Sequence, residues 1–155
     1  MDVKTLGHGR APAGAHAHAT ATATAAPPLL MACLCAQWCD TCRDYMPVFE
    51  ACAASFGAQV QPLWIDIEDD AELIDGIDVE NFPTLLLAHG DALLFLGPIT
   101  PQPQTLARLV ASALAGDLTP RGGDAGGVGG VGGDGMAADV AVPLTRRLRA
   151  RAAAR

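Results

Sequence analysis

Five cysteines crowd into a short stretch of the chain, and two of them, Cys39 and Cys42, are separated by only two residues. On a helix, two thiols at this spacing lie one turn apart, which is near enough to close a disulfide. A Cys-x-x-Cys pair is also common as half of a zinc site. The spacing therefore points to redox chemistry or to metal binding.

A helical pattern follows the pair and predicts which thiol reacts first. Apolar residues recur at three- and four-residue steps from Cys39 to Phe56, and Gly57 ends the pattern. Cys39 would begin this helix, where free backbone N–H groups and the positive end of the helix dipole stabilise a thiolate. We expect Cys39 to be the attacking thiol and Cys42, one turn later, to be the resolving thiol.

Cys33 and Cys35 are the remaining candidates for completing a zinc site. They occupy alternate positions of an apolar strand, so they share one face, and that face can point away from the Cys39–Cys42 pair. No second Cys-x-x-Cys motif and no pair of histidines follows. We therefore favour a redox pair with no bound metal or cofactor, and we interpret Cys33, Cys35 and Cys52 as buried, small apolar side chains.

The other patterned segments predict an α/β domain around the pair. We expect four strands, at 29–35, 60–67, 84–88 and 92–96, and three helices, at 39–56, 69–77 and 104–115. The order is strand, helix, strand, helix, strand, strand, helix. It predicts a three-layer fold with a central four-stranded mixed sheet and flanking helices, in which the first two strands are parallel and the last two form a hairpin.

Both flanks of this 29–118 domain differ from it in composition. Residues 1–28 are rich in Ala, His and Thr and predict a disordered arm, with metal capture by His8, His16 and His18 as the alternative. Residues 119–155 are a Gly-rich linker and an Arg-rich tail. We interpret the tail as solvated, with an unknown partner. The alternative is a short basic helix that contacts lipid, nucleic acid or the acidic domain.

The charge of the domain limits its partners. Acidic residues dominate from 29 to 118, where Arg43 and Arg108 are the only Arg or Lys residues. This argues against nucleic acid as a partner of the domain. No apolar run is long enough to span a bilayer, and the first residues lack a signal-peptide pattern. We therefore expect a cytoplasmic protein, in which thiols are kept mostly reduced.

The chain resembles the thioredoxin family between Leu29 and Leu118. The motifs that carry the likeness are Trp38-Cys39-x-x-Cys42, Pro47, Asp66 at the end of a strand, and Phe82-Pro83-Thr84. The resemblance implies that the peptide bond before Pro83 is cis and packs beside the cysteines. It also implies that Phe82 offers backbone hydrogen bonds to an extended substrate, and that Trp38 covers the disulfide as an apolar platform.

Four features depart from the family pattern. Asp40-Thr41 replaces the usual Gly-Pro, Cys33 replaces a buried aspartate, Trp64 replaces a lysine, and the usual first strand and helix are missing. The charge of Asp40 disfavours a thiolate on Cys39. Because Cys33 is not an acid of that kind, deprotonation of Cys42 would rely on water or on another acid such as Asp66.

These observations predict dithiol–disulfide exchange on disulfide-containing proteins. Cys39 attacks, Cys42 releases the reduced product, and a Cys39–Cys42 disulfide remains. A thioredoxin-reductase-like enzyme or another thiol reductant would regenerate the dithiol. The alternative is a thioredoxin-fold binding or scaffolding module without redox turnover.

Overall fold

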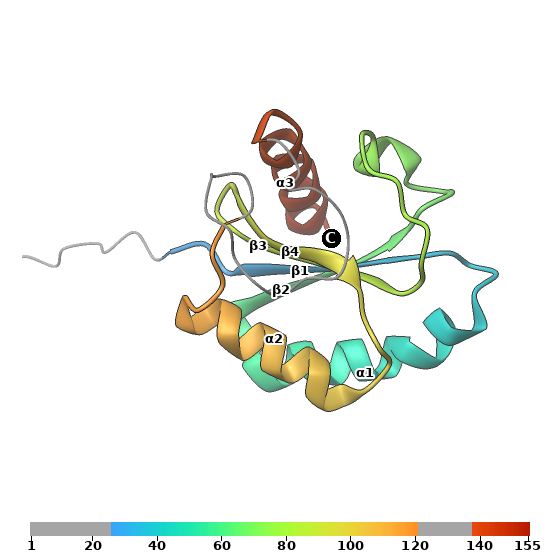
Figure 1. Cartoon of the computed structure of the whole chain (residues 1–155), viewed down its shortest axis with the longest axis horizontal. Helices are drawn as coiled ribbons and strands as arrows, with labels where there is room; N and C mark the ends of the chain where they lie inside the picture. The colour runs from blue at the N-terminus through green and yellow to red at the C-terminus, as the bar shows by residue number, and fades with distance from the viewer. Residues whose placement is uncertain (1–25, 121–137) are drawn as a thin grey trace, which may run out of the picture.

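A computed structural model describes residues 26–120 and 138–155, and within them four strands form one mixed sheet (Figure 1). The strands are β1 (Leu29–Cys35), β2 (Val60–Asp66), β3 (Thr84–His89) and β4 (Ala92–Pro98). They lie in the order β2-β1-β3-β4. β1 is parallel to β2 and antiparallel to β3, and β3 and β4 form the hairpin. The expected α/β class and mixed four-stranded sheet are confirmed.

Two helices cover one face of the sheet, α1 (Asp40–Phe56) and α2 (Pro103–Ala115) (Figure 1). α1 ends at Gly57, whose φ of 55° is a left-handed conformation that glycine adopts without steric cost. α1 leads from β1 into the parallel β2, so this unit positions the residues between β1 and α1 at the carboxyl end of the central strand.

The α-helix expected over 69–77 does not form. Only a short 3-10 helix, η2 (Ala71–Ile74), lies in this segment. The preceding residues are held in a turn, in which the amide of Asp70 donates to the carbonyl of Asp66. Gly76 follows with a φ of 90°. Nucleating an α-helix is costly, and the few residues between these two points leave too little length to offset that cost.

β1 is buried on both faces, and its residues alternate between two apolar clusters. Leu29, Met31, Cys33 and Cys35 face the cluster under α1 and α2. Leu30, Ala32 and Leu34 face the opposite cluster. The central strand therefore needs cover on both sides, and the two clusters have different side chains.

A third helix, α3 (Ala138–Ala153), covers the second face of the sheet (Figure 1). This corrects the expectation that the Arg-rich end is a solvated tail outside the domain. Ala141, Leu144 and Leu148 are buried, because their spacing of three and four residues aligns them on one side of the helix.

In the described part of the chain, no helix is long and apolar enough to cross a membrane. Residues 1–25, which include His8, His16 and His18, and residues 121–137, with the Gly-rich linker, lie outside the described residues.

Arginines of α3 attach the helix to the rest of the domain. Arg149 donates to three backbone carbonyls, those of Gly90 at 2.8 Å, Ala88 at 2.9 Å and Pro28 at 3.0 Å. Other α3 arginines bond to the loops at the edges of this face: Arg146 to Asp91, Arg147 to Leu73 and Asp75, and Arg151 to Asp70. The basic residues that suggested a tail therefore hold α3 in place.

Candidate active site

A tight turn joins β1 to α1 and places Cys39 at the N-cap of the helix. The amide of Cys39 donates to the carbonyl of Ala36 at 3.0 Å, which closes the turn. The backbone of Cys39 is extended, and its Sγ accepts a hydrogen bond from the amide of Cys42 at 3.4 Å. An amide donor and the positive end of the helix both stabilise negative charge on this sulfur, which is the state in which a thiol attacks.

The two sulfurs of the pair differ in accessibility. Cys39 is half-buried, whereas Cys42 is 2% exposed and lies in the cluster under α1. Burial, followed by hydrogen bonds with Cys35 and Cys39, raises the pKa of the Cys42 thiol. An incoming disulfide can therefore reach Cys39 first, while Cys42 is held protonated behind it.

Two aromatic side chains form an apolar rim beside Cys39. The rings of Trp38 and Phe82 meet edge to face, with centroids 5.5 Å apart. The indole of Trp38 is 63% exposed, and its Nε1 donates to Glu68 at 3.2 Å. Phe82 precedes a cis peptide bond to the buried Pro83, which is the geometry that the family resemblance implies. Phe82, from a distant segment of the chain, thus packs with Trp38 next to Cys39.

Asp66 lies at the end of β2, where its carboxylate caps the following turn. Its Oδ1 accepts hydrogen bonds from the amides of Glu68 at 2.9 Å and Asp69 at 3.4 Å. Carboxylates that accept amide hydrogen bonds in this way fix a turn. This turn positions Glu68, whose carboxylate accepts a hydrogen bond from Trp38. Asp66 is therefore linked through Glu68 to the rim of the site. Proton transfer by Asp66 stays a prediction.

The structure corrects the placement suggested for Cys33 and Cys35. Their shared face points toward α1, and both pack in the same cluster as Cys42. Their sulfur atoms are 3.5 Å apart. The alternation of β1 predicts that the two thiols share a face but not which face, so only the fold reveals that they lie on the face of the redox pair. In the described residues, no group of three or more His, Cys, Asp or Glu side chains is arranged to hold a metal.

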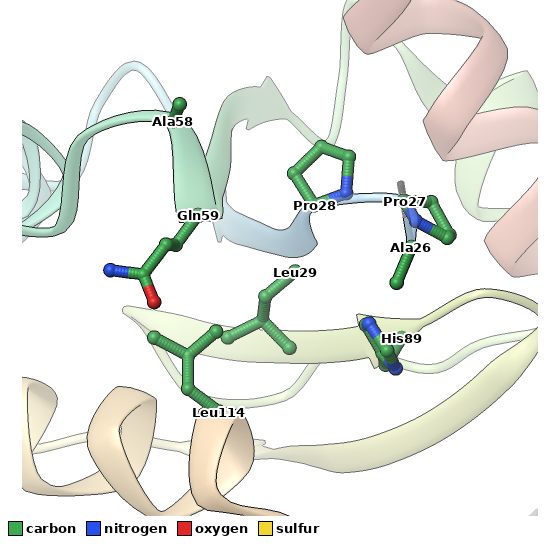
Figure 2. Close-up of a pocket in the computed structure, with 8 residues that line it drawn as sticks. All are labelled: Ala26, Pro27, Pro28, Leu29, Ala58, Gln59, His89 and Leu114. Atoms are coloured by element: carbon green, nitrogen blue, oxygen red, sulfur yellow. The ribbon is translucent and has the colours of Figure 1, made fainter. Parts of the chain in front are cut away.

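A hollow of about 290 Å³ lies at the other end of the sheet (Figure 2). Its lining includes Pro28, Leu29, His89 and Leu114. Leu29 begins β1 and Cys35 ends it, so roughly 20 Å of strand separates the hollow from the redox pair. The hollow is therefore not part of the candidate active site.

Comparison with protein families decides the identity of the domain. The family model described as Thioredoxin matches residues 16–98, which is more than half of the chain. The chain belongs to the thioredoxin family. Membership supports thiol–disulfide oxidoreductase activity as the general class of function. A comparison with curated protein sequences finds no match.

Solved thioredoxins share the fold at low sequence identity. The germline-specific thioredoxin Deadhead of Drosophila melanogaster is 20% identical, with a TM-score of 0.51, and the alignment covers 56% of this chain and 81% of Deadhead. Chloroplastic thioredoxin z is 17% identical, with a TM-score of 0.51 and coverage of 57% and 80%. Thioredoxin-2 of a malaria parasite is 18% identical, with a TM-score of 0.51 and coverage of 55% and 82%. These likenesses show that the thioredoxin fold is present.

Proposed function

We propose that this protein reduces disulfides in other proteins by dithiol–disulfide exchange at Cys39 and Cys42. The observation that carries the proposal is the position of Cys39, a half-buried sulfur at a helix N-cap that accepts the amide of Cys42 at 3.4 Å. An accessible sulfur beside an amide donor and a helix dipole is suited to nucleophilic attack.

The exchange takes two steps. The Cys39 thiolate attacks one sulfur of the substrate disulfide, so a mixed disulfide forms and the other substrate sulfur leaves with the electron pair. The Cys42 thiol loses its proton and attacks the Cys39 sulfur. The second substrate thiol leaves, and the Cys39–Cys42 disulfide remains. Because burial raises the pKa of Cys42, we expect this second step to be the slower one at neutral pH.

The substrate would bind across the rim formed by Trp38 and Phe82. The exposed indole offers apolar contact area. The backbone of Phe82 would bond to an extended chain, whereas the carbonyl of Pro83 already accepts the amide of Ile99. A thioredoxin-reductase-like enzyme or another thiol reductant would regenerate the dithiol. We propose the cytosol as the compartment, because reduced thiols persist there.

Insulin reduction with dithiothreitol tests the proposal. We expect the protein to accelerate the precipitation of reduced insulin, and Cys39→Ser to lower the rate to that of dithiothreitol alone. Cys52→Ala is the matched control, because it removes a thiol of the same core cluster that has no role in the exchange. We expect this control to keep most of the activity of the native protein.

A trapping experiment names the substrates. In Cys42→Ser the mixed disulfide cannot be resolved, so partners should remain linked to Cys39 and be released by reductant for mass spectrometry. A native protein that does not accelerate insulin reduction, and whose Cys42→Ser variant captures no protein, would favour the binding-module alternative.

A further inference from the structure

The loop that holds Glu68 against Trp38 is also attached to the far end of the chain. Arg151, in the last turn of α3, places its Nη2 atom 3.0 Å from Oδ1 of Asp70. Asp70 closes the turn after β2, because its amide donates to the carbonyl of Asp66 at 2.9 Å. A helix on the second face of the sheet therefore contacts the loop that supports the rim of the redox site. The proposed exchange gives this contact no role.

The ion pair between Arg151 and Asp70 is sheltered from solvent. The side chain of Asp70 is 13% exposed, whereas that of Asp91, which pairs with Arg146 of the same helix, is 48% exposed. Water and salt weaken an exposed ion pair more than a sheltered one. Of these two pairs, the one that involves Asp70 is therefore better able to fix a loop.

The two sides of this ion pair are held unequally. On the side of α3, Leu148 is fully buried and Arg149 donates to backbone carbonyls, so the helix is a firm support. The loop of residues 67–70 buries little, since Glu68 and Asp69 are both exposed. Its conformation depends on hydrogen bonds and on its contact with α3, so removal of that contact should loosen the loop and leave the helix in place.

The loop connects the ion pair to the rim through short hydrogen bonds. Asp66 accepts the amide of Asp70 on its carbonyl and the amide of Glu68 on its carboxylate, both at 2.9 Å. Glu68 then accepts Nε1 of Trp38 at 3.2 Å. Because the indole is 63% exposed, it has little packing to fix it. Its orientation depends on Glu68 and on the edge contact with Phe82.

We propose that Arg151 is a positioning residue for the substrate-binding rim: by holding Asp70, it fixes the loop that keeps Glu68 against Trp38. The inference rests on the proposed function, in which the substrate binds across this rim. It gives the last turn of α3 a role besides covering the sheet. The chemistry of Cys39 does not use the loop, so the contact changes the affinity for protein substrates and leaves the reactivity of the thiol unchanged.

The physical basis is preorganisation of Trp38. A side chain that is already ordered loses less conformational freedom when a partner binds, so it binds more tightly. Without the contact to Arg151, the substrate itself has to order the loop and the indole. Binding that is lost equally in the ground state and the transition state raises KM and leaves kcat unchanged.

Kinetics of insulin reduction at a fixed dithiothreitol concentration test this role. We expect Arg151→Ala to raise the KM for insulin about two- to fivefold, the factor that corresponds to losing a partly exposed ion pair, with kcat unchanged. Alkylation of Cys39 by iodoacetamide, a small reagent that needs no rim, should keep its native rate. Arg151→Lys should restore the KM, because one cationic nitrogen on one carboxylate oxygen makes the contact.

Arg146→Ala is the matched control for Arg151→Ala. It also removes an arginine of α3 that pairs with an aspartate, but Asp91 follows β3, at the opposite end of that strand from Phe82. We expect this control to keep the native KM for insulin. Asp70→Ala breaks the pair of Arg151 from the loop side, so it serves as the second variant if Arg151→Ala does not fold.

Fluorescence of Trp38 gives a readout that needs no substrate. The chain has two tryptophans, and Trp64→Phe removes the other one while keeping an aromatic ring against Phe49. In this background, Arg151→Ala should increase the quenching of Trp38 by acrylamide without changing the far-UV circular dichroism. Arg146→Ala should change neither measurement.

A double-variant comparison shows whether Arg151 acts through Glu68. If it does, Arg151→Ala/Glu68→Ala should have the same KM as Glu68→Ala alone, because changes along one line of contacts do not add. The inference is overturned if the two effects multiply, or if Arg151→Ala leaves the quenching of Trp38 or the KM of an active protein unchanged. It is also overturned if Arg146→Ala raises the KM equally. A native protein that reduces no insulin removes the proposed function, whereas increased quenching in Arg151→Ala would still support the contact between α3 and the rim.

Discussion

The two faces of the central sheet carry different chemistry, although the side chains of both faces alternate along the same strands. On β1, Cys33 and Cys35 face α1 and join the redox pair, whereas Leu30, Ala32 and Leu34 face α3. A strand sends neighbouring side chains to opposite faces, so reactive thiols are confined to one side without interrupting the strand. The other side has only to bury apolar surface.

The two faces are also held by different means. The thiol face is closed by α1, which follows β1 directly in the sequence, and by α2. The second face is closed by α3, from the far end of the chain, with Arg149 bonded to the backbone of three separate residues. We therefore expect changes on the α3 face to alter stability, and changes on the thiol face to alter reactivity.

Deletion of residues 138–155 should have the largest effect. Burying a leucine contributes roughly 1.5–3 kcal/mol, and whole domains are stable by only about 5–15 kcal/mol. Removing α3 uncovers a complete sheet face, so we expect loss of the cooperative thermal transition in circular dichroism. Deletion of Ala154 and Arg155 alone, which lie beyond α3, is the control and should melt like the native chain. A shortened chain that still melted sharply would show that the second face needs no cover.

This expectation reverses the one that the composition suggests. Arg-rich sequence among alanines is typical of a solvated tail, yet Ala141, Leu144 and Leu148 recur at the spacing of an amphipathic helix. The signal was present but short, and one of its three residues is alanine. A stronger signal lay in β1, where Leu30, Ala32 and Leu34 require a second apolar layer. The segments up to residue 118 supply that layer only in part, through Ile74 and its neighbours.

The redox motif was predictable because its geometry is local. Cys39 and Cys42 lie within one helical turn, so their relation follows from helix spacing alone. The position of Cys33 and Cys35 relative to the pair depends on which side of the sheet α1 crosses. That is a property of the tertiary fold, and the residues themselves do not encode it at short range.

Leu148→Ala should cause the next largest loss. Leu148 is fully buried against the second face, and truncation of such a side chain costs about 2–5 kcal/mol through lost burial and the cavity left behind. Urea denaturation measures this loss. Insulin reduction below the melting temperature should stay close to the native rate, because Leu148 lies on the face away from Cys39. A large loss of activity with little loss of stability would contradict the division between the faces.

Arg149→Lys should destabilise the protein by about 1–3 kcal/mol, the range for losing hydrogen bonds to a charged group. A lysine keeps the positive charge but cannot reproduce a planar fork that reaches three carbonyls. Arg146→Lys is the matched control, since Arg146 is exposed and bonds to Asp91. Urea denaturation should show a smaller loss for the control. Equal losses would mean that the charge of α3 matters and the geometry of Arg149 does not.

Raising the pH should have the smallest effect on stability, and this effect should depend on the thiol face and not on the α3 face. The folded state raises the pKa of Cys35 above its ordinary value of 9.0, so it holds that proton more tightly than the unfolded chain does. The resulting stabilisation is complete below pH 9.0 and is lost as the pH rises above it. For one such thiol, the loss reaches about 1.4 kcal/mol one pH unit above the unfolded pKa.

Reduced protein should therefore lose stability between pH 7 and pH 10, and Cys35→Ala should lose less. Leu34→Val, one residue away on the α3 face, should lower stability equally at both pH values, because no titrating group is removed. Urea denaturation of the three proteins under reductant makes the comparison. If Cys35→Ala kept the full pH dependence of the native chain, Cys35 would not be held as a buried, protonated thiol. The chemical contrast between the faces would then rest on Cys42, Cys52 and Tyr45, whose pKa values burial also raises.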